Sequence, residues 1–159
     1  KSGEVHSFEP MAPTFEELKS NFTLMGEPKN VHINNLALGD KKDELEIFLF
    51  PELTTGHASI SKKEDENYVS YKCQMITLDS YLEDKKIENV NFIKIDIECA
   101  ELLFLKGAGK VFNQKIPPIW LMEMALQQTK NFDYTPNDII QFMKERVAYS
   151  FFKIDELKF

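Results

Sequence analysis

Three carboxylates, Asp96, Glu98 and Glu101, lie within six residues of one another. Asp96 lies within a mostly apolar, β-branched run, 92–97, and the other two acids follow this run. Such a run is typical of a strand buried on both faces of a parallel sheet. Leucines at helical spacing come next and end at Gly107, so the pattern predicts a central strand, an acidic loop and a helix. Ligands of open α/β sheets bind beyond the carboxyl ends of the strands, which makes Asp96 and Glu98 candidate site residues. The alternative interpretation is a solvated helix start, where the helix dipole favours acids.

Two more acids lie at the ends of predicted strands. The segment 4–10 predicts a short strand that ends at Glu9, because Pro10 cannot donate to a strand ladder. A carboxylate in this position can accept hydrogen bonds from both hydroxyls of a ribose, although an ordinary strand-end acid is the simpler interpretation. The apolar segment 119–124 predicts another buried strand, with Glu123 near its end. We therefore expect one edge of the sheet to carry Glu9, Asp96, Glu98 and Glu123.

No cysteine pattern indicates a metal site. Neither Cys73 nor Cys99 belongs to a Cys-x-x-Cys or zinc-type spacing, so no metal ligand is assigned. The clustered carboxylates are the only alternative, as ligands of a hard divalent ion. His57 lies in a stretch of small residues, 54–59, and is either a solvent-exposed loop residue or a histidine near the crevice.

The rest of the chain predicts elements around this edge. Thr14 is a candidate helix N-cap with Glu17 as its capping-box partner. Later helices are predicted to start at Thr77 and Thr135. Further strands are predicted at the start of 31–40 and at 45–50, 69–75 and 148–154. Alternating apolar and polar residues in 69–75 indicate one buried and one wet face, in an antiparallel addition formed with 45–50.

The composition favours one globular domain over residues 1–159. Hydrophobic residues make up 43% of the chain and aromatic residues 12%, which argues against disorder. The net charge of −7, without a basic stripe, argues against nucleic acid and anionic membrane surfaces as partners. No apolar run approaches the ~20 residues of a membrane-spanning helix. The chain starts at Lys1 without a Met, so an upstream leader or anchor stays open, and with it the compartment.

The segment 94–108, Lys-Ile-Asp-Ile-Glu-Cys-Ala-Glu-Leu-Leu-Phe-Leu-Lys-Gly-Ala, closely resembles the signature of FkbM-type methyltransferases, which use S-adenosylmethionine. The segments Phe-Glu-Pro at 8–10 and Thr-Leu-Asp-Ser-Tyr-Leu at 77–82 resemble the same family. Cys99 replaces a glycine that is usual there. The resemblance implies a Rossmann-like three-layer α/β fold with a mostly parallel sheet and an inserted antiparallel hairpin. It also implies methyl transfer to a hydroxyl oxygen of a sugar or natural product, which makes the acceptor a small molecule or a glycan.

The resemblance also implies roles for individual residues. Five positions are assigned to the cofactor: Glu9, Ala37, Leu38, Asp40 and Asp96. In this assignment Glu9 binds the ribose, the segment 37–40 lies near the adenine, and Asp96 lies near the methionine end. Asp40 has the alternative of a plain polar turn. Glu98 is the first candidate for orienting the acceptor or removing its proton, and Glu123 is the second.

The sequence contains no glycine-rich nucleotide loop. In such methyltransferases this loop follows a first strand, so we expect the chain to begin inside the fold, beyond that strand. The missing strand belongs between the strands that end at Glu9 and Asp96, and its absence predicts two unpaired edges that face each other. Two alternatives stay open. One is a non-catalytic interaction or pseudoenzyme domain, and the other is a different nucleotide enzyme such as a dehydrogenase, for which no hydride-transfer site is found.

Overall fold

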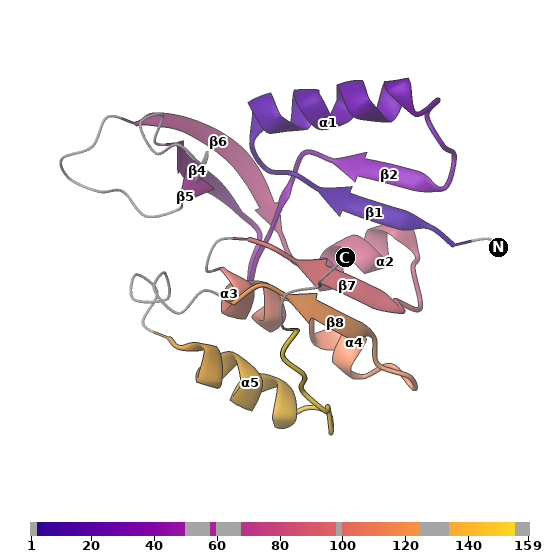
Figure 1. Ribbon diagram of the computed structural model, residues 1–159, viewed down its shortest axis with the longest axis vertical. Coiled ribbons are helices and arrows are strands. Elements are labelled where there is room, and N and C mark those ends of the chain that lie inside the picture. Colours follow the sequence, from indigo (N-terminus) through magenta and orange to yellow (C-terminus); the bar gives the residue numbers. More distant parts are fainter. Residues whose placement is uncertain (1–2, 50–57, 60–67, 98–99, 125–133, 155–159) are drawn as a thin grey trace.

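The computed structural model describes residues 3–49, 58–59, 68–97, 100–124 and 134–154. These residues form a mixed α/β fold with two small parallel sheets and one mixed sheet (Figure 1). The strands are β1 (Val5–Phe8), β2 (Val31–Asn34), β3 (Ala37–Leu38), β4 (Asp43–Leu49), β5 (Ala58–Ser59), β6 (Val69–Ile76), β7 (Phe92–Ile95) and β8 (Ile119–Met122). The helices are α1 (Ala12–Leu24), α2 (Leu78–Lys85), α3 (Glu101–Lys106), α4 (Gly109–Phe112) and α5 (Pro136–Lys144).

The first parallel pair consists of β1 and β2, and α1 connects them (Figure 1). The register runs from Val5 opposite Val31 to Phe8 opposite Asn34, which confirms the strand predicted before Glu9. The less exposed residues of α1 are Phe15, Leu18 and Phe22, which lie on one face of the helix.

The predicted start of α1 is wrong. The helix begins at Ala12 with Met11 as its N-cap, so Thr14 lies inside the first turn and Glu17 is not its capping-box partner. The cause is local, because the Glu9 carboxylate accepts a hydrogen bond from the Met11 N–H at 2.9 Å and satisfies a donor at the helix start. Proline in the first turn then suits the helix, since its missing N–H is not needed there.

The mixed sheet has the strand order β3-β6-β4-β5. β4 pairs antiparallel with β6 from Asp43 opposite Met75 to Leu49 opposite Val69, which confirms the predicted antiparallel addition. Cys73 and Met75 are buried, whereas the intervening Gln74 is exposed, as the alternation predicted. β3 joins the other side of β6 in parallel and brings residues 37–38 to this sheet.

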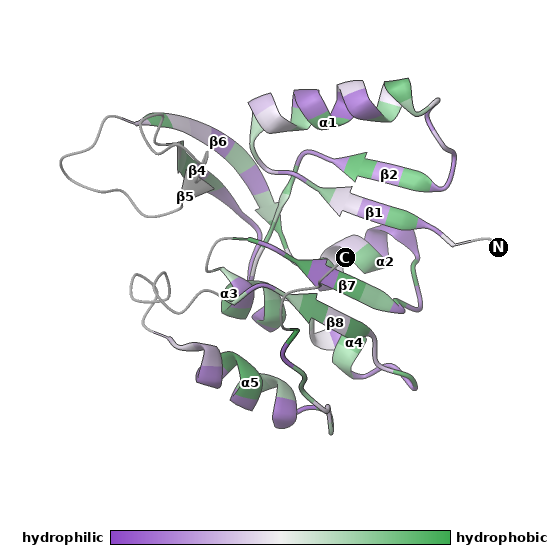
Figure 2. Ribbon diagram, viewed as in Figure 1, coloured by the Kyte–Doolittle hydropathy of each residue, from purple (hydrophilic) through white to green (hydrophobic). Residues whose placement is uncertain are grey.

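The second parallel pair consists of β7 and β8, and the main core lies against one of its faces. Ile95 is 3% exposed, but Phe92 is 55% exposed and its register partner Ile119 is 70% exposed. The prediction that both strands are buried on both faces is therefore wrong for the described residues. The buried core cluster draws on β7, on α2 to α5 and on Tyr134, and Figure 2 shows the apolar residues along β7 and β8.

Within the described part of the chain, β1 pairs only with β2 and β7 only with β8. In Figure 1 the four arrows point the same way, and β7 follows β1 in the view without a hydrogen-bonded ladder between them. The expectation of a missing strand between β1 and β7 stays a prediction.

Two of the predicted helix starts are confirmed. Thr77 Oγ1 accepts a hydrogen bond from the Ser80 N–H at 3.0 Å and caps α2. At α5, the Asp138 carboxylate accepts hydrogen bonds from the N–H and the hydroxyl of Thr135, both at 2.7 Å. None of the described helices is long and apolar enough to cross a membrane.

The predicted last strand is absent from 148–154, which is irregular. Its apolar residues predicted a strand, but this segment pairs with no strand among the described residues. A hydrogen bond to the Tyr149 side chain holds it in place instead. The Trp120 indole N–H donates to the Tyr149 hydroxyl at 2.8 Å, and Phe152 is 87% exposed.

Candidate functional site

Three of the predicted acids follow strands that point the same way. Glu9 comes directly after β1, Asp96 after β7 and Glu123 after β8. The Glu123 N–H donates to the Ile95 carbonyl at 3.1 Å, which continues the β7–β8 register and sets Asp96 and Glu123 at neighbouring positions. Because the strand arrows share one direction in Figure 1, the three residues lie at the carboxyl edge, as the sequence predicted.

Glu9 has the most structured surroundings of these acids. Its side chain is half-buried, and one carboxylate oxygen accepts the Met11 N–H at 2.9 Å. Burial raises the pKa of the Glu9 carboxyl, and the Met11 hydrogen bond offsets part of that rise. Among the described residues, this is the one hydrogen bond made to the carboxylate, so its second oxygen is available to a ligand.

An asparagine that sequence reasoning missed holds the Glu9 turn in place. The Asn35 side-chain amide donates to the Glu9 carbonyl at 2.8 Å and to the Pro10 carbonyl at 3.1 Å. The backbone contributes as well, because the Glu9 N–H donates to the Asn34 carbonyl at 3.0 Å. The signal available in the sequence was the Asn-Asn pair at the end of a predicted strand, where amide side chains commonly bind local backbone groups.

The structure brings part of the segment 37–40 close to this turn. Ala37 is 7% exposed and belongs to the same buried cluster as Met11, two residues beyond Glu9. Leu38 packs against the other, larger core cluster. Asp40 is exposed, and nothing in the described structure connects it to Glu9. The structure therefore associates Ala37 with the Glu9 turn, but not Asp40.

The acids around 96–101 have different surroundings. Asp96 is exposed and its carboxylate accepts a hydrogen bond from the Lys94 ammonium at 2.7 Å. Glu101 is 3% exposed and accepts a hydrogen bond from the Tyr134 hydroxyl at 3.3 Å. Sequence reasoning placed Glu101 only at a helix start. The missed signal was its spacing of four residues from Leu105, which sets both on the buried face of α3.

Several predicted features lie outside the described residues. They are Glu98, Cys99, His57 and most of the loop 54–59. Their assigned roles therefore stay predictions.

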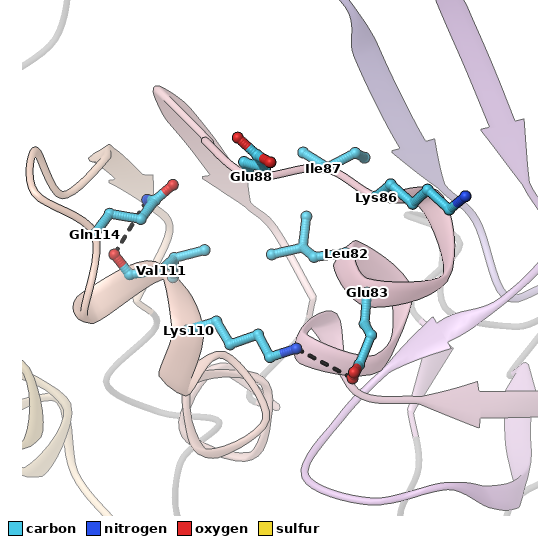
Figure 3. A pocket seen from close by; sticks show the side chains of 8 residues that line it. All are labelled: Leu82, Glu83, Lys86, Ile87, Glu88, Lys110, Val111 and Gln114. Carbon is cyan, nitrogen blue, oxygen red and sulfur yellow. Dashed lines mark hydrogen bonds and ion pairs between the residues drawn. The ribbon is translucent and has the colours of Figure 1, made fainter.

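Two pockets in the described part of the structure lie away from the acidic edge. One, of about 380 Å³, lies between α2 and α4 and is crossed by a 3.1 Å ion pair between Lys110 and Glu83 (Figure 3). Ile87, before β7, and Gln114, before β8, also line it, which places it toward the amino ends of these strands. A second pocket, of about 320 Å³, is lined by Asn34, at the end of β2, and by Leu36, just before β3. The second pocket is therefore nearer to the predicted cofactor segments.

Comparison with known proteins identifies related sequences and structures. A family model described as the methyltransferase FkbM domain matches residues 1–151. The crystal structure of methyltransferase FkbM from Methylobacillus flagellatus KT superimposes with a TM-score of 0.60 at 15% sequence identity. The match covers 91% of this chain and 31% of that one, so the chain spans about a third of the solved protein. At this identity the likeness concerns the fold. No curated protein sequence matches the chain.

Proposed function

Because this chain belongs to the FkbM methyltransferase family, whose model matches residues 1–151, we propose that it takes part in methyl transfer from S-adenosylmethionine. The acceptor in this proposal is a hydroxyl oxygen of a sugar or natural product, so the partner is a small molecule or a glycan. The same proposal assigns β1, β2, β7 and β8 to one Rossmann-like three-layer sheet. The common direction of the four strands supports it (Figure 1).

The observation that carries the proposal is the fixed orientation and free acceptor capacity of the Glu9 carboxylate. A cofactor ribose presents two neighbouring hydroxyls, and an ionised carboxylate accepts from both. One Glu9 oxygen already accepts the Met11 N–H at 2.9 Å, which fixes the orientation of the group. Oxygen atoms have more than one lone pair, so this oxygen and its partner both keep acceptor capacity. The acceptor atoms of Glu9 therefore fit the two hydroxyls of a ribose, and the Asn35 side chain holds the turn through its hydrogen bonds to the Glu9 and Pro10 carbonyls.

The remaining cofactor contacts follow from the strand ends. Ala37 and Leu38 provide apolar and backbone surface for the adenine, with Asp40 at the outer end of the segment. Asp96 provides an exposed carboxylate for the ammonium group of the methionine part. This ammonium competes with the Lys94 ammonium, which donates to Asp96 at 2.7 Å. In these assignments the cofactor extends from its adenine, near β2 and β3, past the ribose at the end of β1 to its methionine part at the end of β7.

The chemistry requires little covalent work from the protein. S-adenosylmethionine, when bound, supplies a sulfonium methyl for in-line displacement by the acceptor oxygen. The protein aligns the acceptor, excludes water and takes the hydroxyl proton. We assign the last task to Glu98 first. Glu123 is the second candidate, because it is exposed at the same edge and lies beside Asp96.

A second candidate function is a non-catalytic interaction domain. The exposed apolar side chains of β7 and β8 favour it, with Phe92 at 55%, Ile119 at 70% and Leu121 at 36% exposure.

Calorimetric titration of the full protein with S-adenosylmethionine separates these functions. Glu9→Gln keeps an acceptor for the Met11 N–H and removes the charge, while the matched Glu17→Gln variant changes an exposed acid on α1. Hydrogen bonds to charged groups contribute about 1.5–3 kcal/mol, so Glu9→Gln should weaken binding roughly 10- to 100-fold. Glu17→Gln should bind as the parent does. Binding that Glu9→Gln leaves unchanged refutes the ribose assignment, and a folded protein without any binding contradicts the cofactor proposal for this chain.

A further inference from the structure

A second cluster of chemically competent side chains lies near the start of the first parallel pair. Glu4 precedes β1, His6 lies within β1 and His32 lies opposite His6 on β2. The two imidazole rings stack with their centroids 4.5 Å apart and an interplanar angle of 17°. One donor atom from each of the three residues lies within 4.8 Å of the other two. Among the described residues, no other group of histidine, cysteine and acidic side chains has its donor atoms so close together.

The hydrogen bonds around His6 fix which ring nitrogen faces this cluster. The Asn34 side-chain amide donates to two backbone carbonyls, at 2.9 and 3.3 Å, so its oxygen is the acceptor for the Tyr81 hydroxyl at 3.1 Å. Because Tyr81 donates its proton to Asn34, its oxygen accepts from His6 Nδ1, which lies 2.8 Å away. In the neutral ring the lone pair is then on Nε2. Metal-binding histidines usually donate their other ring N–H to an oxygen in this way, which orients the nitrogen that binds the metal.

The lone pair on His6 Nε2 faces another electron-rich atom. Glu4 Oε2 lies 3.7 Å from it, which is longer than a normal hydrogen bond. Two ligand atoms bound to one zinc ion at about 2.0–2.1 Å in tetrahedral geometry are separated by about 3.3 Å. A cation between the two atoms would therefore need only a small inward movement of the exposed Glu4 side chain.

We propose that Glu4, His6 and His32 form a binding site for one divalent transition-metal ion of the zinc class. Two imidazoles and one carboxylate are a common three-residue set for zinc, with water in the fourth position. The lone pairs lie in the ring planes, so the stacked rings must tilt apart to share an ion. His32 is exposed and has room to turn. Metal binding therefore exchanges the ring stack for coordination.

This metal site is distinct from the proposed cofactor site. Glu4 and Glu9 are five residues apart and flank opposite ends of β1, which corresponds to about 16 Å along an extended strand. The metal joins the beginning of β1 to β2 directly, and to α2 through Tyr81. Its expected effect is to stabilise the β1–β2 pair, independently of whether the protein binds S-adenosylmethionine.

Competition titration of the metal-stripped full protein with Zn²⁺ and a chromophoric chelator tests the site. The exposed residues are the ones to change, because His6 is part of a half-buried hydrogen-bond chain and its loss could prevent folding. We expect one Zn²⁺ per chain, with affinity at least tenfold weaker in His32→Gln and in Glu4→Gln. The matched control is His57→Gln, which removes the only histidine outside the cluster and should bind as the parent does.

A second readout follows the ligand atoms themselves. Co²⁺ bound in place of Zn²⁺ should give visible absorption typical of a four-coordinate site in the parent protein and in His57→Gln, and none in His32→Gln. Circular dichroism verifies that each variant is folded. The proposal is overturned if the stripped protein binds no Zn²⁺, if His32→Gln keeps full affinity, or if His57→Gln loses it.

Discussion

Replacement of Gly107 by alanine should destabilise the protein through a clash between two backbone segments. Gly107 ends α3 with φ −88°, a value that any residue adopts, so its conformation does not require glycine. The space does. A Cβ at this position would overlap the carbonyl oxygen of Gly39 and would lie 3.2 Å from the Thr77 Cβ. Gly39 cannot retreat easily, because its N–H donates to the Ile76 carbonyl at 2.9 Å.

The size of the effect follows from overpacking. Forcing an extra carbon into a packed site costs about 1–3 kcal/mol, and the contact with rigid backbone favours the upper half of that range. Glycine-to-alanine replacement returns about 0.4–1 kcal/mol through the unfolded chain, which leaves a net loss of about 2 kcal/mol. For a chain of this size that corresponds to a fall in Tm of about 4–8 °C.

Thermal unfolding followed by circular dichroism measures this shift, and Gly109→Ala is the matched control. A Cβ at Gly109 would meet only the Asp79 carboxylate, at 3.2 Å from Oδ2, and a side chain can yield where backbone cannot. We expect Gly109→Ala to change the free energy of unfolding by less than about 0.5 kcal/mol. A Gly107→Ala protein as stable as the parent, or no less stable than Gly109→Ala, would refute the close approach of α3 to the end of β3.

Two further predictions concern a helix cap and the proposed ribose ligand. Thr77→Ala removes the acceptor of the Ser80 N–H and should lower the free energy of unfolding by about 1 kcal/mol, whereas Thr77→Ser should retain it in the same thermal experiment. Burial raises the pKa of Glu9, and only its ionised form accepts from both ribose hydroxyls. Calorimetry across pH should therefore show S-adenosylmethionine affinity falling as pH is lowered through the raised pKa of Glu9. A Glu9→Gln protein without such a change would support the assignment, and one with the same change would contradict it.

The elements that sequence reasoning placed well are those with strong local signals. The helix starts at Thr77 and at Thr135, the alternation along β6 and the acids directly after β1, β7 and β8 were confirmed, whereas the helix start at Thr14 was not. Each depends on chemistry within a few residues, such as a hydroxyl that reaches an N–H three positions on. The family likewise followed from short contiguous segments, chiefly 94–108, with 8–10 and 77–82 in support.

The wrong predictions share a different cause. The start of α1 depends on a hydrogen bond from Met11 to the Glu9 carboxylate, an alternative to the Thr14 cap that the pattern alone could not rank. The burial of β7 and β8 was predicted for two faces, yet the described helices cover one, so the second face is exposed. The apolar segment 148–154 has strand composition but no ladder partner in the described structure.

The sequence by itself determined where the strands end and which acids follow them, and through these residues the family and the proposed cofactor. Only the tertiary structure decided which side chains meet. Asn35 holds the Glu9 turn, Tyr134 reaches the buried Glu101, and His32 stacks on His6. The partners in these contacts are about 25 to 33 residues apart. Local patterns carry no information about such pairs, because their proximity depends on strand register and on the packing of helices against the sheet.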